Sequence, residues 1–548
     1  MKLIHVRINS AGACGGLLDG FDLWLRGTEI NSSAFDPLCL IGPNGTGKSQ
    51  FLQALVEAFQ LAFLACVPEE EYANKFPDLL FEIEYLIRPQ GAEQHVHVRI
   101  VRQIIRRQIN FTIQRNVDNE WVDCPITHSD TIALLPKRII GYTSGNNETL
   151  SLPFLMSRSG YAMKVGTQAL KDDDDSRIPE TRLLMIDYGT NLEVLVANLL
   201  LGEINQRRVL LDIARLHDLH SFRCIIQLAH SAAPKLPLRN NIARKRKAIQ
   251  RKGIQLTNEL ENYIEQLKRC STCYDYDEKN ERYTFDFYVT DETRAAFRHY
   301  WQEGALELYS SFHKLAMLND LALPKESRAL FVKKNNTHFS SRLPEPQEQD
   351  KVFRFDNVCF AAQNTGKVVD YVSLSDGEHQ LAQILGTFCM ISDENVLFLL
   401  DEPESHFNPL WRIKFISSLL DVPTKNGMRR DKGAPITEQD CLLTTHAPFV
   451  PSDMPRDKVL IFSKDEERSR ITVQRPKIET YGTTFDDILD ECFGVRPPIS
   501  AVAHQEIEIL KESADIIEIQ DGIDRLGFSV EKVFLVDKLR ELTSQGDV

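Results

Sequence analysis

The sequence lacks an uninterrupted hydrophobic run long enough to cross a membrane. Its most apolar long stretch, residues 51–67, contains Gln53, Glu57 and Gln60, and such side chains are costly inside a bilayer. The first sixteen residues alternate apolar and polar side chains, so they do not resemble a secretory leader. We therefore expect a cytoplasmic protein with no membrane partner.

The eleven cysteines form neither a disulfide framework nor a zinc site. Cys270 and Cys273 make one isolated C-x-x-C, without a second pair or two histidines at zinc spacing. A redox or metal role for this pair remains an alternative. The scattering favours reduced structural thiols, which agrees with the cytoplasm.

Positive charge is in short supply, because 64 lysines and arginines face 78 acidic residues, for a formal net charge of −14. This balance excludes a protein that coats nucleic acid over its whole surface. The 43% apolar and 26% charged residues are those of an ordinary globular protein. A chain of 548 residues is long enough for two to four folded units.

Residues 37–59 predict a strand, a glycine-rich loop and a helix in direct succession. The loop matches the phosphate-binding pattern G-x-x-x-x-G-K-[ST] at Gly42, Pro43, Asn44, Gly45, Thr46, Gly47, Lys48 and Ser49. In such a loop backbone N–H groups surround phosphate oxygens, the lysine contacts the β- and γ-phosphates, and the hydroxyl binds Mg²⁺. We predict an ATP site here rather than a chance glycine-rich turn.

A second part of the same chemistry lies far downstream, where the apolar run 396–400 ends in Asp401 and Glu402. An unbroken apolar run is typical of a central parallel strand. Two acids at its end suit phosphoryl-transfer chemistry, with Asp401 holding Mg²⁺ and Glu402 orienting or deprotonating water. His446 ends the next predicted strand and matches the switch histidine of ABC-type ATPases.

Residues 374–380, LSDGEHQ, precede a helical pattern and resemble the ABC signature. The predicted signature residues are Ser375, Asp376, Gly377 and Glu378. A serine cap and a glycine at a helix N-terminus make an anion site without its own lysine. The resemblance implies contact with the γ-phosphate held by another subunit, and therefore a head-to-tail dimer or a higher oligomer sharing its ATP molecules.

The glutamine loop of the same superfamily is missing. Its place corresponds to residues 137–147, which contain no glutamine. Ser144, Asn146 and Asn147 are the candidate substitutes. ATP binding is therefore better supported by the sequence than rapid hydrolysis.

A large insertion separates the motifs, because Lys48 and Leu374 are 326 positions apart. Residues 80–125 alternate as a β meander does, and residues 190–330 predict mainly helices. Residues 235–252 carry eight basic side chains and no acid, and a helical stripe continues to Leu267. This run is either a solvated face or a nucleic-acid contact made by Arg244, Lys245, Arg246, Lys247, Arg251 and Lys252.

About a hundred residues follow His446, and they contain no recognisable nuclease set. The segment from Glu531 to Asp537 lacks the acidic pair of a Toprim nuclease, and no H-N-H pattern is present. We predict an ABC/SMC-type α/β P-loop ATPase with an antiparallel β lobe. Its parts are the N-terminal ATPase portion 1–170, a mainly helical insertion 171–350, the C-terminal ATPase portion 351–475 and a helical tail 476–548.

Together GPNGTGKS, LSDGEHQ, LFLLDEPESHFNP and TTHAPF resemble the PtuA-type ATPases of Septu and retron-associated anti-phage defence. His406-Phe-Asn departs from the Leu-His-Pro of many relatives. The resemblance implies an HNH nuclease partner of the PtuB type, and a retron reverse transcriptase with its multicopy RNA–DNA hybrid. It also makes the tail a candidate docking region for the nuclease.

Two other functions share these motifs. A RecF/Rad50-like DNA-repair ATPase has every nucleotide motif, and genomic neighbours would separate it from a defence protein. A transporter energiser is disfavoured by the large insertion and by the missing glutamine loop, which couples such ATPases to a membrane partner.

Overall fold

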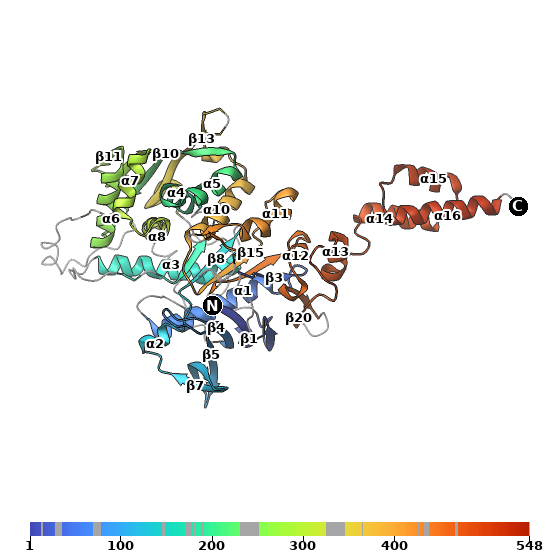
Figure 1. Cartoon of the computed structure of the whole chain (residues 1–548), viewed down its shortest axis with the longest axis horizontal. Helices are drawn as coiled ribbons and strands as arrows, with labels where there is room; N and C mark the ends of the chain where they lie inside the picture. Colours follow the sequence, from blue (N-terminus) through green and yellow to red (C-terminus); the bar gives the residue numbers. More distant parts are fainter. Residues whose placement is uncertain are drawn as a thin grey trace.

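The computed structural model describes most of the chain (Figure 1). Residues outside the described part are 13–14, 28–34, 69–77, 145–147, 170–177, 180, 188–190, 231–250, 252, 325–345, 364, 425–426, 432–437, 466–469 and 547–548. The described helices are α1 (Lys48–Cys66), α2 (Ser129–Ile132), α3 (Glu148–Gln168), α4 (Asn191–Leu201), α5 (Ile204–Ile213), α6 (Asn258–Cys270), α7 (Asp291–Tyr300), α8 (Ala305–Met317), α10 (Asp376–Met390), α11 (Pro409–Leu420), α12 (Phe449–Ser452), α13 (Phe485–Phe493), α14 (Ala501–Glu512), α15 (Ile516–Arg525) and α16 (Val530–Gly546).

A seven-stranded sheet joins the two ends of the sequence. Its order is β20 (Ile471–Gln474), β19 (Val459–Lys464), β3 (Leu38–Ile41), β18 (Asp440–Thr445), β15 (Val396–Asp401), β8 (Arg138–Thr143) and β9 (Leu183–Ile186). All neighbours pair in parallel except β20, which is antiparallel to β19. The predicted strands at 38–41, 396–400 and 441–445 are therefore three adjacent strands, whose carboxyl ends meet at one edge.

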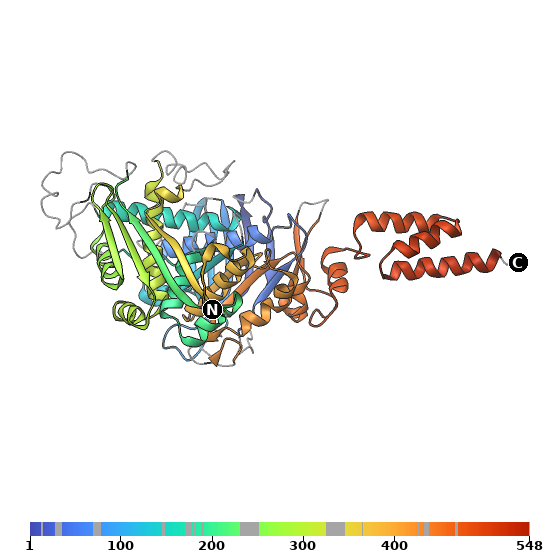
Figure 2. The same ribbon diagram turned by 90° about the horizontal axis from the view of Figure 1, so that it is seen from above.

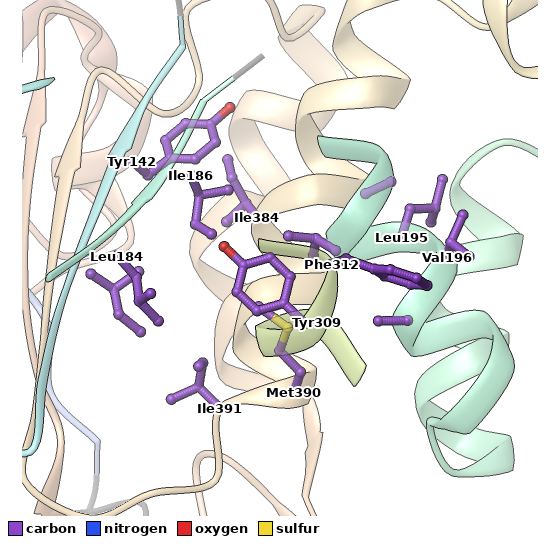
Figure 3. Close-up of a cluster of buried hydrophobic side chains, with 14 of the residues drawn as sticks. Tyr142, Leu184, Ile186, Leu195, Val196, Tyr309, Phe312, Ile384, Met390 and Ile391 are labelled. Carbon is purple, nitrogen blue, oxygen red and sulfur yellow. The ribbon is translucent and has the colours of Figure 1, made fainter. Parts of the chain in front are cut away.

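The sheet is buried on both faces because its strands are apolar at successive positions. Leu397 and Leu399 face a hydrophobic cluster shared with α1. Phe398 and Leu400 face the opposite cluster, which includes residues of α4, α8 and α10. Figure 3 shows part of this second cluster, with Tyr309 close to the sheet residues. Side chains alternate across a strand, so unbroken apolar runs are what a sheet covered by helices requires.

Helix α1 is the described helix whose length and hydropathy would allow it to cross a membrane. In its most apolar window 78% of the residues are buried inside the protein. Its burial against the sheet accounts for its apolar composition.

A six-stranded antiparallel sheet contains the predicted meander. Its order is β2 (Phe21–Trp24), β1 (Lys2–Ala11), β4 (Leu79–Ile87), β5 (Val96–Ile105), β6 (Gln108–Val117) and β7 (Glu120–Cys124). The alternation in 81–85, 95–101 and 110–114 correctly predicted β4, β5 and β6. Apolar residues on one face of this sheet join the cluster around α1.

The insertion has the predicted helices α4 to α8. It also contributes three strands that were not predicted from the sequence, to a sheet whose other two strands come from residues 351–475. A five-stranded antiparallel sheet has the order β11 (Cys273–Asp277), β12 (Arg282–Tyr288), β10 (Leu216–Gln227), β13 (Phe353–Ala362) and β14 (Val368–Asp370). A further two-stranded sheet pairs β16 (Pro423–Thr424) with β17 (Gly427–Met428). Strand β10 does not bury every second residue regularly. Its sequence therefore lacks the alternation of apolar and polar residues by which a strand is recognised.

The predicted helical stripe ending at Leu267 is correct only from Asn258 onward. Thr257 caps α6 by accepting a hydrogen bond from Leu260 N. Before it, the backbone passes so close to Leu228 that a Cβ at Gly253 would collide with the Leu228 carbonyl. Ile254 N donates to that same carbonyl at 2.7 Å. Tertiary contact with the end of β10 therefore overrides the local helical pattern.

The helical tail ends in a small unit built from α14, α15 and α16. It has a hydrophobic cluster of its own, formed by Ile507, Leu510, Ile519, Ile523 and Leu535. Two views at right angles show this unit projecting away from the rest of the chain (Figures 1 and 2). Its helices therefore have an independent core and a large accessible surface.

Candidate functional site

The glycine-rich loop connects β3 to α1 at the carboxyl edge of the central sheet. Gly42 has a φ of 144°, and a Cβ there would collide with the carbonyl oxygen of Phe462 in β19. Only glycine allows the loop to leave β3 this close to the neighbouring strand. The loop then turns directly into a 19-residue helix, as a phosphate-binding loop requires.

Lys48 lies over this loop rather than in solvent. Its Nζ donates to the carbonyl oxygens of Gly42 at 2.9 Å and Pro43 at 3.0 Å, and the residue is 4% exposed. Burial lowers the pKa of Lys48 to about 8, against the opposing effect of Glu402 and Asp401. These two carbonyls hold the Lys48 ammonium beside the loop backbone. An anion bound in the loop would therefore contact both the ammonium and the backbone N–H groups.

Ser49 and Asp401, the two predicted Mg²⁺ ligands, are in direct contact. Ser49 Oγ donates to Asp401 Oδ1 at 2.9 Å, and Thr444 Oγ1 donates to the same oxygen at 2.6 Å. Burial raises the pKa of Asp401 above its ordinary value, although both hydrogen bonds act in the opposite direction. Hydroxyl and carboxylate oxygens are the hard ligands that Mg²⁺ prefers, so this pair fits the ion.

Glu402 is held by the predicted switch histidine. His446 Nε2 lies 3.0 Å from Glu402 Oε1, and this hydrogen bond lowers the pKa of Glu402. Glu402 also has a φ of 49°, a left-handed conformation that costs a side-chain-bearing residue about 1 kcal/mol or more. Its backbone N–H donates to Thr444 Oγ1 at 3.0 Å. The strained turn aims a charged carboxylate out of a buried strand.

Thr445 and Glu404 form a second bridge that the sequence reading missed. Thr445 Oγ1 donates to Glu404 Oε1, and Glu404 is 3% exposed. Burial raises the pKa of Glu404 to about 7. Consecutive threonines thus tie the strand before His446 to both acids flanking Glu402. The only signal in the sequence is a third acid in the run Asp401-Glu-Pro-Glu404.

The signature residues begin α10 as a capped helix N-terminus. Ser375 accepts from Glu378 N, and Glu378 Oε2 accepts from Ser375 N at 2.7 Å, which makes a capping box. Ser375 and Asp376 are exposed. A Cβ at buried Gly377 would lie 2.9 Å from the carbonyl oxygen of His406. The glycine therefore packs α10 against the loop that follows Glu402, while the helix end stays accessible.

A glutamine of another element contacts the segment in which the glutamine loop is missing. Gln380 Nε2 of α10 donates to the carbonyl oxygen of Ser144 at 2.6 Å, directly after β8. Gln383, one turn further on, donates to the carbonyl of Asp187 after β9. Asn146 and Asn147 lie outside the described residues. The helix that carries the signature thus contacts the ends of two strands of the central sheet, and Gln380 was already present in LSDGEHQ.

The predicted nucleic-acid residues divide into two groups. Arg244, Lys245, Arg246, Lys247 and Lys252 lie outside the described residues. Arg251 is described, and its Nε donates to Glu261 Oε1 at 2.7 Å while the guanidinium lies over the Tyr283 ring. Its side chain is 3% exposed. Arg251 belongs to an internal ion pair with Glu261. This corrects its prediction as a residue that contacts nucleic acid.

The comparisons with known proteins give little further assignment. No protein-family model matches the sequence, and no curated protein matches it. Thirty-four chains of solved structures match, among them the SMC head domain from Thermotoga maritima. That match has a TM-score of 0.32 and 9% identity, and it covers 87% of this chain and 100% of that chain. The motifs and the geometry of the site are therefore the main indications of function in this chain.

We predict that ATP affinity decreases between pH 7 and pH 9. A lysine with a pKa of about 8 is charged at pH 7 and mostly neutral at pH 9, and only the charged form attracts phosphate. The dissociation constant for a fluorescent ATP analogue at saturating Mg²⁺ should rise about tenfold over this range. Lys48→Arg is the control, because arginine keeps its charge and should give a flat profile. A flat profile in the wild type would contradict the assignment.

We predict that Glu404→Gln is more stable than the wild type at pH 7 and above. A carboxyl whose pKa is raised from 4.5 to about 7 loses stability as the pH rises through that interval, because the unfolded state releases its proton first. Glutamine has no proton to lose and keeps the acceptor for Thr445. The difference in melting temperature between Glu404→Gln and wild type should therefore become more positive from pH 5 to pH 7.5. A difference that does not change with pH would rule out a buried neutral carboxyl.

Proposed function

We propose that this chain is the ATP-binding regulatory subunit of an anti-phage defence complex. In this proposal a separate HNH nuclease of the PtuB type cuts nucleic acid, and the ATP-bound assembly controls it. The observation that carries the ATP-dependent part is the convergence of Ser49, Asp401 and Thr444 beside Lys48. The defence role is supported by the resemblance of four motifs to the PtuA-type ATPases.

Groups suited to binding ATP and Mg²⁺ lie together at the carboxyl edge of the central sheet. The loop backbone and the Lys48 ammonium supply positive potential for phosphate. Ser49 and Asp401 supply oxygen ligands for the ion, and Thr444 fixes the orientation of the carboxylate. Bound Mg²⁺ would contribute charge neutralisation on the phosphates. Glu402, fixed by His446 on one side and by its strained backbone on the other, is the group placed to hold the attacking water.

The exposure of the signature residues supports a site shared by two subunits. Ser375 and Asp376 occupy an accessible, capped helix N-terminus, and the helix dipole there favours an anion. A second copy packed head to tail would present this end to the nucleotide held by the first copy, and each copy would complete the other's site. Such an isologous arrangement closes as a dimer with twofold symmetry.

The contacts of α10 support a switch that works through this helix. Its first turn is the signature, and Gln380 ties its second turn to the end of β8. Further along, Asn198 of α4 donates to the carbonyl of Gly386 at 3.0 Å, and Gln206 of α5 donates to that of Cys389 at 3.0 Å. A displacement of the signature by a bound nucleotide would therefore reach the insertion through hydrogen-bonded contacts.

The proposed complex also contains a retron reverse transcriptase and its RNA–DNA hybrid, as the resemblance implies.

The projecting helices α14 to α16 are the proposed dock for the nuclease. The unit exposes large apolar side chains, with Val502 at 79% and Ile517 at 73% on its helices and Phe528 at 97% between α15 and α16. Exposed apolar side chains gathered on a small appended unit are typical of a binding surface.

We predict that Lys48→Ala abolishes ATP binding and phage protection together. Removing the ammonium leaves the phosphates without their main side-chain contact. ATP binding is measured by equilibrium dialysis with purified protein, and protection by plating phage on cells that carry the complete gene neighbourhood. Surface substitution Lys279→Ala, in the exposed turn between β11 and β12, serves as the control and should change neither. Full protection in a Lys48→Ala strain that has lost ATP binding would refute ATP control.

We predict that Glu402→Gln retains ATP in a stable dimer. Glutamine keeps the size of the side chain but cannot deprotonate water, so bound ATP should persist. Nucleotide retention after gel filtration and the mass of the assembly by light scattering measure the effect. If retention and mass equal those of the wild type, binding without turnover is the correct description of this protein.

A further inference from the structure

The antiparallel sheet ends in an exposed ribbon formed by residues 103–110, at the tip of β5 and β6. Its pairs are Gln103 with Asn110, Ile104 with Ile109 and Ile105 with Gln108. The neighbouring strand β4 pairs with β5 only as far as Arg102, and β7 pairs with β6 only from Ile113 onward. The ribbon therefore extends beyond both neighbours by three pairs, about 10 Å. In Figure 1 β5 and β7 lie at one extremity of the chain.

The ribbon is basic in a chain that is otherwise acidic. Residues 94–117 contain five arginines and no aspartate or glutamate, whereas the whole chain has a net charge of −14. Two of these arginines are used inside the fold. Arg99 donates to Gln114 and lies over Trp121, and Arg102 donates to the carbonyl of Leu79. Arg106, Arg107 and Arg115 are exposed.

The turn itself is strained, and its residues are not those that the turn favours. Arg106 and Arg107 have φ values of 50° and 66°, as in a type I′ turn, where asparagine, aspartate and glycine are preferred. The next turn of the same sheet has φ values of 53° and 68° at Asp118 and Asn119, which follow the preference. Two arginines in left-handed conformation therefore point to a role outside the turn.

The ribbon also exposes apolar side chains between its charges. Ile104 is 59%, Ile105 46% and Ile109 48% exposed, and Ile104 and Ile109 are directly paired. Gln103 and Asn110 form the adjacent pair, Gln108 is paired with Ile105, and all three amides are exposed. The tip thus combines cations, amides and isoleucines on a narrow two-stranded element.

We propose that this ribbon docks duplex nucleic acid, with Arg106 and Arg107 on phosphates and Ile104 and Ile109 in a groove. A two-stranded ribbon fits the roughly 12 Å major groove of a DNA duplex, and apolar side chains on such elements contact bases or wedge between them. The amides match base edges and sugar–phosphate oxygens. The inference deepens the proposed function, on which it rests for the presence of nucleic acid in the complex.

A lipid surface fits the same residues less well. Insertion would bring the open hydrogen-bonding edges of residues 103–110 and three amide side chains into hydrocarbon. Each unsatisfied polar group there costs several kcal/mol. In the groove of a duplex, the same amide side chains and backbone groups can form hydrogen bonds with the nucleic acid and with water.

The test is the binding of a fluorescent 30-base-pair DNA duplex, the matching RNA–DNA hybrid and the single strand by anisotropy. Purified full-length protein is used without nuclease or nucleotide, between 50 and 200 mM salt. Arg106→Ala/Arg107→Ala should weaken duplex binding at least about tenfold and lower the salt slope by about two. Ile104→Ser/Ile109→Ser should weaken it with the slope unchanged.

The matched control is Arg525→Ala/Arg540→Ala, which removes two exposed arginines from the tail and should leave binding unchanged. Equal binding by the ribbon variants and the wild type would overturn the proposal. Flotation with anionic vesicles that depends on Ile104 and Ile109, without duplex binding, would overturn it in favour of a membrane contact. Because nucleotide is absent, failure here leaves ATP control to be decided by Lys48→Ala.

Discussion

The contact of Ser49 and Thr444 with one oxygen of Asp401 is the constraint on which the rest of the site depends. It joins segments that are 352 and 43 positions apart. The contact exists only because β3, β18 and β15 are adjacent and in register, with Leu400 opposite Leu443. A slip of β15 by one residue would turn Asp401 to the face of the sheet opposite to that of Thr444. The two apolar clusters fix this register, because each accepts only one set of alternating side chains.

Helix α10 connects this site to the insertion. One hydrophobic cluster contains residues of the central sheet, of α10 and of the insertion helices α4 and α8, so these elements pack as one body. Close-packed protein interiors transmit displacement rather than absorb it. The insertion is therefore built onto the signature helix, and Gln380 gives that helix a second attachment at the end of β8.

Charge is distributed unevenly over the chain, and this decides where a polyanion is able to bind. The one described member of the predicted basic run, Arg251, is neutralised by Glu261 inside the fold. By contrast, the tip of β5 and β6 has no acid in its sequence neighbourhood and keeps Arg106 and Arg107 at the surface. A run of basic residues in the sequence does not by itself make a basic surface, because a buried arginine paired with a carboxylate contributes little positive potential outside the protein.

The sequence by itself determined the elements of the candidate nucleotide site. Gly42 to Ser49, the strand ending in Asp401 and the strand ending before His446 each carry a local pattern, and apolar strands followed by small or charged residues need no partner to be recognised. The tertiary structure alone decided the rest. Strand β10 lacks a regular period, Glu404 and Gln380 acquire partners only when distant strands end beside them, and Arg251 loses its surface role through Glu261. These features depend on contacts between residues far apart in the chain, which local periodicity and propensity do not contain.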